Sequence, residues 1–233
     1  MKRIPFENCK AIFFDFDGVI ANTEWLHFRA FNQVLKNFNI NVSKKEYLKE
    51  YLAYDDKGCF KKVFLIKQNK EISKAQIKKL IKQKNRILMK QLKTNGFEFF
   101  PDTLKFINNI KKLYNIQLCI VSGALKQEIL YILKKLKIQK MFSIIVSAED
   151  VKNGKPSPEP YIVAKNKLEK KLNKKIKNEQ IYVIEDSING INAAKAAGFI
   201  TIGVAHTYSL KKLKTVHPDF LVKNLADIKL THN

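Results

Sequence analysis

The 233-residue chain has no long apolar run and few cysteines. No segment approaches the ~20 consecutive apolar residues that span a bilayer, and the opening "MKRIPFENCK" lacks the apolar stretch of a secretory signal. Cys9, Cys59 and Cys119 are odd in number, widely spaced and form no CxxC pair, which argues against a disulfide framework or a cysteine-based zinc site. We therefore expect a cytoplasmic protein with reduced thiols and no membrane partner.

Arginine is also scarce, although the chain is strongly basic. Of 44 lysines and arginines, Arg3, Arg29 and Arg86 are the arginines, and the net charge is +23. Such a charge could indicate nucleic-acid binding, but arginine is the preferred residue for bidentate contacts with phosphates and bases. The lysines are scattered rather than gathered in a tail. We expect no nucleic-acid partner and keep a basic nucleic-acid-binding protein on an inactive scaffold as a remote alternative; the positive field would attract small anionic substrates.

Short apolar runs alternate with amphipathic stretches from residue 97 onward. This alternation predicts an α/β fold with a Rossmann-like parallel-sheet core, to which "AIFF" contributes the first strand. One helix is predicted to begin with Ser157 as N-cap and Pro158 at the first helical position, and another to end at Gly198. The predicted strands are residues 11–14, 116–121, 143–146, 181–184, 200–204 and 220–222.

The stretch from residue 22 to 95 contains no convincing strand. It has helical spacing of apolar residues and two predicted capping boxes, Ser43 with Glu46 and Ser73 with Gln76. We expect about four helices here, inserted after the first strand. The predicted domains are therefore an α/β core, residues 1–20 and 96–233, and a helical domain, residues 21–95.

Polar residues follow three of the predicted strands directly. Asp15 and Asp17 end "IFFDFDG", Ser122 ends "LCIVSGA", and Glu185 and Asp186 end "IYVIEDS". Ligands of an open α/β sheet bind outside the carboxyl ends of its strands, so these groups should converge on one crevice. Taken alone, Asp186 could be a helix cap and Ser122 a turn residue.

Lys155 lies in the Gly/Pro-rich loop "KNGKPSPEPY" and could by itself be a solvated lysine. Clustered carboxylates repel one another and need a cation. Their hard oxygen ligands suit Mg²⁺, which commonly shares phosphate oxygens of a substrate. The joint occurrence of these residues therefore predicts a magnesium site.

The set DFDGV, SGA, GKPSPEPY and EDS, in this order, resembles the haloacid dehalogenase superfamily. It looks most like the group of phosphoglycolate phosphatases, sugar-phosphate phosphatases and β-phosphoglucomutase, over nearly the whole chain. The resemblance implies that Asp15 is the nucleophile that becomes an aspartyl-phosphate. It implies that Asp17 is the acid and then the base, that Ser122, with the adjacent Gly123, binds the phosphoryl group, and that Lys155 neutralises charge. Mg²⁺ would be held by Asp15, the backbone carbonyl of Asp17, and Asp186, with Glu185 in support.

The helical domain would then be a cap that closes over the crevice and reads the substrate. Thr23 and His27 follow the first motif at positions where members of the family carry a threonine and a histidine. His27 would orient either Asp17 or the substrate; the alternative is a partly buried histidine without such a role. The segment "LAYDDKGCFKK" can be aligned in two ways. It is similar to the Lys-Gly-x-x-Arg run of the mutases. It is more similar to an Asp-Asp-Arg-x-x-Phe run of phosphatases, with Lys57 in place of the arginine. Lys57 is either the cation that meets the substrate or a solvated lysine.

These observations predict a monomeric, Mg²⁺-dependent phosphatase that acts on a small phosphorylated metabolite. A phosphosugar mutase is the alternative, because either water or a second sugar hydroxyl could accept the phosphoryl group.

Overall fold

The computed structural model describes residues 2–230. The chain divides into two compact units. The sheet unit consists of the residues up to Asn22 and those from Phe99 onward, and the helical unit is Thr23–Glu98. Among the described residues, no helix is both long and apolar enough to cross a membrane.

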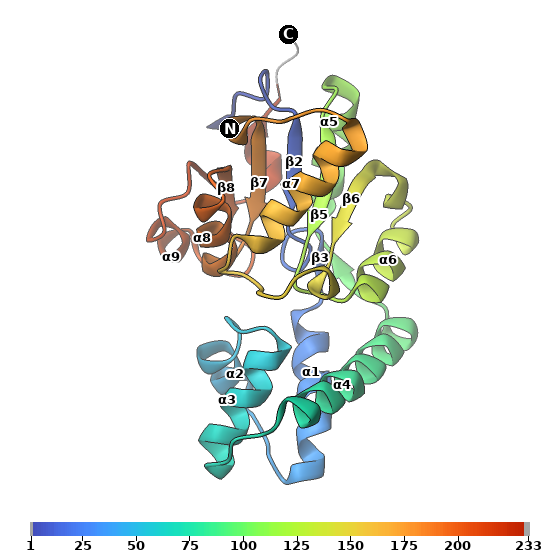
Figure 1. The fold of residues 1–233 in the computed structure, drawn as a ribbon, viewed down its shortest axis with the longest axis vertical. Helices are drawn as coiled ribbons and strands as arrows, with labels where there is room; N and C mark the ends of the chain where they lie inside the picture. Colours follow the sequence, from blue (N-terminus) through green and yellow to red (C-terminus); the bar gives the residue numbers. More distant parts are fainter. Residues whose placement is uncertain (1, 231–233) are drawn as a thin grey trace. The chain divides into compact units, whose positions relative to one another are not determined.

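The sheet unit is built on six parallel strands in the order β6-β5-β2-β7-β8-β9 (Figure 1). The first strand of this sheet in sequence, β2, is central and fully buried, as expected for a strand covered on both faces. Because all six strands run in one direction, their carboxyl ends meet at the same edge. The strands are β2 (Ala11–Phe14), β5 (Gln117–Val121), β6 (Phe142–Val146), β7 (Ile181–Glu185), β8 (Ile200–Val204) and β9 (Phe220–Val222).

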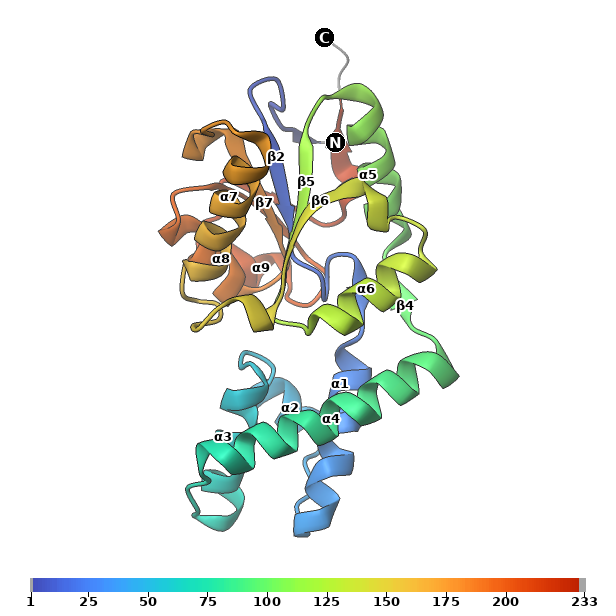
Figure 2. The same ribbon diagram turned by 45° about the vertical axis from the view of Figure 1, so that its right-hand side comes forward.

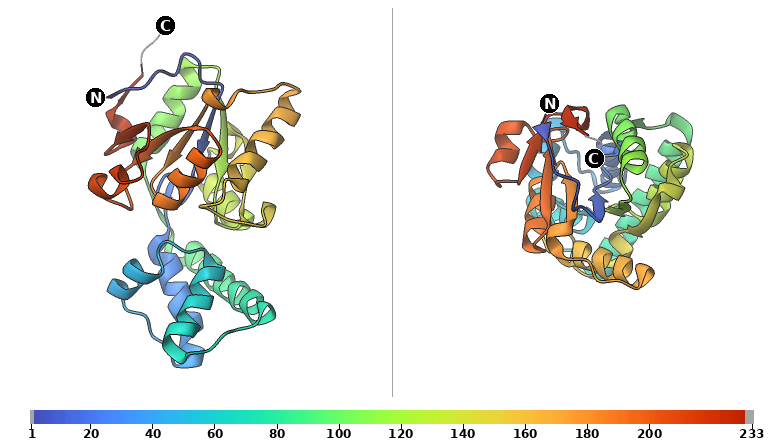
Figure 3. Two further views of the ribbon diagram at one scale, coloured as in Figure 1. Left: turned by 60° about the vertical axis from the view of Figure 1, so that its left-hand side comes forward. Right: turned by 90° about the horizontal axis from the view of Figure 1, so that it is seen from above.

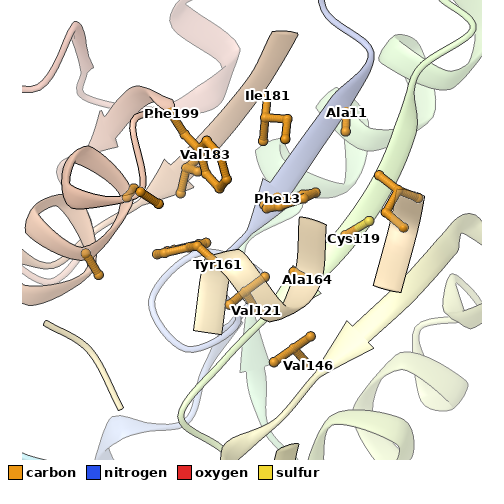
Figure 4. Packing of buried hydrophobic residues seen from close by; sticks show 14 of the residues in the cluster. Ala11, Phe13, Cys119, Val121, Val146, Tyr161, Ala164, Ile181, Val183 and Phe199 are labelled. Carbon is orange, nitrogen blue, oxygen red and sulfur yellow. The ribbon is translucent and has the colours of Figure 1, made fainter. Parts of the chain in front are cut away.

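Helices cover both faces of the sheet (Figures 2 and 3). On one face, α7 (Glu159–Leu172) and α8 (Ile188–Ala196) pack on alternate strand residues such as Phe13 and Val183 (Figure 4). On the other face, Phe106 of α5 (Pro101–Leu113) contacts Phe14 edge to face, with ring centroids 6.3 Å apart. The period of two in a strand explains why consecutive phenylalanines enter different layers.

The remaining elements are short or peripheral. Helix α8 ends as predicted, with Gly198 at a φ of +76°. Helix α7 starts later than predicted: it begins at Glu159, Pro158 occupies the N-cap, and Ser157 Oγ accepts from the Glu159 N–H at 3.2 Å. Proline can take the cap because its φ is already suited to a helix start. The other elements are β1 (Lys2–Arg3), β3 (Ala21–Asn22), β4 (Glu98–Phe99), β10 (Ile228–Lys229), α6 (Lys126–Lys135), α9 (Leu210–Lys214) and the 3₁₀ turns Lys36–Phe38, Gln139–Met141, Ala148–Asp150, Asn178–Gln180 and Leu225–Asp227.

The helical unit contains four α-helices around its own aromatic core. Phe31 and Phe60 lie at its centre, with ring centroids 5.0 Å apart. The helices are α1 (Glu24–Leu35), α2 (Lys44–Glu50), α3 (Asp56–Gln68) and α4 (Lys74–Asn95).

Only one of the two predicted capping boxes in this unit is complete. Ser73 and Gln76 exchange both hydrogen bonds at the start of α4. At the start of α2, Ser43 accepts from the Glu46 N–H, but the Glu46 carboxylate lies 2.7 Å from Lys67 Nζ. The second box is therefore half formed, because a tertiary ion pair engages the side chain that would have completed it.

Candidate active site

Three buried carboxylates meet at the carboxyl edge of the sheet. Asp15 follows β2, while Glu185 ends β7 and Asp186 follows it. Their exposed fractions are 8%, 0% and 3%, and one oxygen of each lies within 4.8 Å of the others. The parallel register of β2 and β7, which pairs Phe14 with Ile184, brings the two acidic segments together.

Lys155 enters this cluster from the loop between β6 and α7. Its Nζ donates to Asp15 Oδ1 at 2.5 Å, to Glu185 Oε1 at 2.6 Å and to the Val121 carbonyl at 2.9 Å. An ammonium group has three N–H donors, and all three are used. The same loop is held by Glu159, whose carboxylate accepts from the Lys152 N–H at 2.7 Å. Lys155 is therefore a fixed part of the site.

The electrostatics of the cluster favour an additional cation. Burial raises the pKa of Asp15 to about 8; the Lys155 charge opposes this shift, and the Glu185 charge adds to it. Burial and the neighbouring carboxylates also raise the pKa of Asp186 well above its usual range. For Lys155, burial alone would lower the pKa, but Asp15 and Glu185 outweigh it and raise the pKa. One ammonium faces three carboxylates, and these hard oxygen ligands can hold a divalent metal ion.

Sequence reasoning did not identify the residues that hold Glu185. Tyr161 on α7 donates its hydroxyl to Glu185 Oε1 at 2.7 Å, and the Ser187 hydroxyl donates to Oε2 at 3.0 Å. Gly190 leaves room for this carboxylate, because a Cβ there would lie 1.8 Å from Glu185 Oε1. Both oxygens of Glu185 thus have protein partners, which fits a supporting rather than a leading role toward a metal.

Asp17 lies in the turn that follows β2, where its backbone bridges to Ala21. Gly18, next in sequence, has a φ of +80°, and its N–H donates to the Ala21 carbonyl at 2.7 Å. A Cβ on Gly18 would lie 1.8 Å from Asp186 Oδ2. The glycine of the DFDG run is therefore required twice, by the positive φ and by close packing on Asp186.

Ser122 follows β5, the other neighbour of β2, and is buried. Its N–H extends the ladder to the Val146 carbonyl at 2.9 Å, and its Oγ accepts from the Ala124 N–H at 3.0 Å. Gly123 between them is exposed, and a Cβ there would meet no atom within 4 Å. Ser122 thus makes the predicted turn contact, and this turn leaves the backbone of Gly123 open.

The three residues predicted to read the substrate belong to the helical unit. Thr23 is buried at the N-cap of α1, and Lys57 is exposed in the first turn of α3. His27 is half-buried, and its Nδ1 lies 2.8 Å from the ammonium group of Lys84. Lys84 also forms an ion pair with Asp56 and is only 3% exposed. Sequence reasoning overlooked Lys84, although its spacing from Leu80 and Leu88 puts it on the buried face of α4.

Comparison with known proteins identifies relatives along most of the chain. A model of the family described as haloacid dehalogenase-like hydrolase matches residues 12–204. A phosphorylated carbohydrates phosphatase of Thermotoga maritima is 30% identical over 201 residues, which cover 85% of this chain and 86% of that protein. A pyrophosphatase PpaX of Oceanobacillus iheyensis is 29% identical, with 94% of each chain covered.

A solved structure of similar fold is the β-phosphoglucomutase of Clostridium difficile. Its TM-score is 0.78, with 95% of this chain and 94% of that chain covered. The sequence identity is 23%, so this likeness concerns the fold.

Proposed function

This chain belongs to the haloacid dehalogenase-like hydrolase family, and from that premise we propose that it is a Mg²⁺-dependent phosphatase that works through an aspartyl-phosphate on Asp15. The observation that carries the proposal is the group of three buried carboxylates, Asp15, Glu185 and Asp186, with the partly buried Lys155 at the carboxyl edge of the sheet. A carboxylate nucleophile, a fixed ammonium and further acids are the parts that phosphoryl transfer through a carboxylate needs.

In this proposal, one oxygen of Asp15 attacks phosphorus, and the bond from phosphorus to the leaving oxygen breaks. Lys155 lies 2.5 Å from Asp15 Oδ1, where its charge favours the ionised carboxylate against the effect of burial and would offset the charge of the incoming phosphate. Asp15, Asp186 and the backbone carbonyl of Asp17 would hold Mg²⁺, with Glu185 in support. Bound there, the ion would supply positive charge to the phosphate oxygens and offset the repulsion among the acids.

Asp17 is proposed to handle the protons of both steps. It would protonate the leaving oxygen as the aspartyl-phosphate forms, and then take a proton from the water that hydrolyses it. Asp17 lies close enough to Asp15 for its charge to raise the pKa of Asp15, which supports a role for both acids at the same reacting group. Ser122 and Gly123 are proposed to bind the phosphoryl group from the end of the neighbouring strand.

The proposed substrate is a small phosphorylated metabolite, hydrolysed by a cytoplasmic monomer. Support for this class comes from the names of the relatives, which act on phosphorylated carbohydrates and pyrophosphate. Thr23, His27 and Lys57 are proposed to read the substrate from the helical unit. The net charge of the chain, +23, would attract small anionic substrates to the protein.

The test is phosphate release from a panel of sugar phosphates, phosphoglycolate, pyrophosphate and nucleotides, each with Mg²⁺ and with EDTA. We expect release that requires Mg²⁺ and is lost in Asp15→Asn. Asp102→Asn, a partly exposed acid in the first turn of α5, is the matched control and should keep wild-type rates. Conversion of β-glucose 1-phosphate to glucose 6-phosphate without phosphate release would replace the phosphatase with a mutase. Mg²⁺-independent release, or release that survives in Asp15→Asn, would contradict the mechanism.

A further inference from the structure

The loop that follows β8 holds a histidine against the DFDG segment. His206 Nδ1 lies 2.8 Å from the Gly18 carbonyl oxygen. A carbonyl oxygen only accepts hydrogen bonds, so Nδ1 is the donor, and this contact fixes which ring nitrogen carries the proton. The two residues are 188 positions apart in sequence, so the contact is made only by the folded sheet unit.

The imidazole of His206 is itself held in place. It stacks on Phe100, with ring centroids 3.9 Å apart and an interplanar angle of 6°. The Asn224 side chain forms a further hydrogen bond with it. The loop backbone is tied to β9 where the Ala205 N–H donates to the Val222 carbonyl at 3.1 Å. His206 is therefore an oriented donor with little freedom to follow a moving acceptor.

Both polar backbone groups of Gly18 are consequently fixed, the N–H by Ala21 at 2.7 Å and the carbonyl by His206. Gly18 directly follows Asp17, so fixing its backbone restrains the turn that carries the Asp17 side chain. The residue after His206 contacts the second acidic segment, since the Thr207 side chain hydrogen-bonds to Asp186. The β8 loop thus touches both acidic segments of the site.

We propose that His206 is a positioning residue, whose hydrogen bond to Gly18 fixes the backbone that carries Asp17. The inference rests on the proposed function, because it concerns the placement of the group that protonates the leaving oxygen. His206 acts through the Gly18 peptide and needs no contact with the substrate.

Two amide variants separate the hydrogen bond from the ring. An asparagine amide nitrogen can occupy the place of the histidine Nδ1, whereas a glutamine amide extends to the place of Nε2. His206→Asn should therefore keep the bond to Gly18, and His206→Gln should lose it, while both lose the stack on Phe100. His217→Asn is the control, since His217 is exposed and its φ of 49° is one that asparagine tolerates.

The kinetic test compares an alkyl phosphate with p-nitrophenyl phosphate, whose leaving group departs without a proton. For His206→Gln we expect kcat/KM on the alkyl phosphate to fall by about 10- to 100-fold, because a misplaced acid loses most of its effect. On p-nitrophenyl phosphate we expect a fall of less than about three-fold, the size of one modest lost interaction. His217→Asn should remain near wild type on both substrates, and His206→Asn, which keeps the bond but not the stack, should lose much less than His206→Gln on the alkyl phosphate. Phe100→Leu, which leaves the imidazole in place without its stacking partner, should show a smaller loss in the same direction.

Equal losses on the two substrates, or equal losses in His206→Asn and His206→Gln, would overturn the proposal and leave only a packing role. Amide hydrogen exchange of residues 16–21 gives a readout that needs no turnover: exchange should be faster in His206→Gln than in His206→Asn. Unchanged exchange would also overturn the proposal. If the wild type released no phosphate from any substrate, the proposed function would fail, while hydrogen exchange would still decide the role of His206.

Discussion

Each unit of this protein contains a lysine whose side chain is largely withdrawn from solvent and contacts acids, but the two lysines differ in what surrounds them. Lys155 in the sheet unit faces Asp15 and Glu185, and Asp186 lies beside them. Lys84 in the helical unit forms an ion pair with Asp56 and contacts His27. At Lys155, acids outnumber the ammonium group, so the cluster still needs positive charge. At Lys84, the ammonium group forms an ion pair with one carboxylate, and the charges of this pair balance.

This difference teaches that burial of a lysine does not by itself indicate chemistry. A balanced buried pair is costly to break but calls for no ligand. In an acid-rich cluster at the edge of a parallel sheet, a bound cation can balance the excess negative charge. Replacing Lys155 should therefore mainly lower the rate of turnover, whereas replacing Lys84 should mainly lower the stability of the protein.

The largest effect is expected for Lys155→Met. Without the ammonium group, Asp15 loses a charge that favours its ionised form and phosphate loses a counter-charge, so kcat/KM should fall about 10³-fold or more. Phosphate-release kinetics on the best substrate measure this loss. Lys152→Met, an exposed lysine of the same loop whose backbone, not its side chain, binds Glu159, should leave the rate unchanged. A Lys155→Met enzyme with more than a tenth of wild-type activity would contradict the assignment.

Lys84→Met should act mainly on stability. It leaves the partly exposed Asp56 without its ion-pair partner, at a cost of about 1 to 2 kcal/mol in the free energy of unfolding. Urea denaturation measures this cost, with the exposed Lys82→Met of the same helix as control. The double variant Lys84→Met/Asp56→Asn should recover part of the loss, because neither charge then remains unpaired. A large fall in kcat with an unchanged free energy of unfolding would contradict the predicted difference between the two lysines.

Metal removal should make stability depend on pH through the sheet unit. The folded-state pKa of Asp15 is raised from 3.8 to about 8, so between these values the folded protein binds more protons than the unfolded chain. The contribution of Asp15 to stability must then fall as pH rises from about 4 to 8. In EDTA we expect the melting temperature to decrease between pH 5 and pH 8, and Mg²⁺ to restore it most at pH 8. Asp15→Asn should flatten the dependence; an equally steep profile in that variant would show that the dependence does not arise from Asp15.

The smallest effects compare two helix caps. Ser73 completes a capping box at α4, whereas Ser187 caps α8 and also donates to Glu185. Both serine-to-alanine variants should lose about 1 kcal/mol of stability, the usual value of an N-cap. Only Ser187→Ala should also lower kcat/KM, by a few-fold, because Glu185 loses one of its donors. Equal kinetics in the two variants would show that Glu185 is held well enough without that hydroxyl.

The fold could be predicted from the sequence because its signals are local. Buried parallel strands are short apolar runs, and each was found in the observed sheet, with the α/β class confirmed. Asp15, Ser122, Glu185 and Asp186 were identified because a strand end is visible in sequence as the point where an apolar run stops. Their catalytic roles remain predictions. Tyr161 lies within the motif GKPSPEPY, but only the structure shows its hydroxyl on Glu185.

Two other residues were missed for different reasons. The burial of Lys84 could have been predicted, because Lys84 falls on the apolar stripe of α4 with Leu80 and Leu88. It was missed because this helix contains many lysines. His206 carried none, because its partner Gly18 is distant in sequence and the contact depends on where the β8 loop meets the β2 turn. Periodicity and motif spacing do not predict a contact of this kind between two distant loops.

The central place of β2 has a consequence for how the chain is made. Its hydrogen-bonding neighbours are β5 and β7, which begin at Gln117 and Ile181, so a ribosome translating at about 5–20 residues per second releases β2 roughly ten seconds or more before both partners exist. The helical unit is continuous in sequence and is complete well before then. During synthesis, the strand that leads to Asp15 is therefore an apolar segment with two unpaired edges at a time when the helical unit is already complete in sequence. A chaperone that protects nascent chains would have most to protect in residues 11–14.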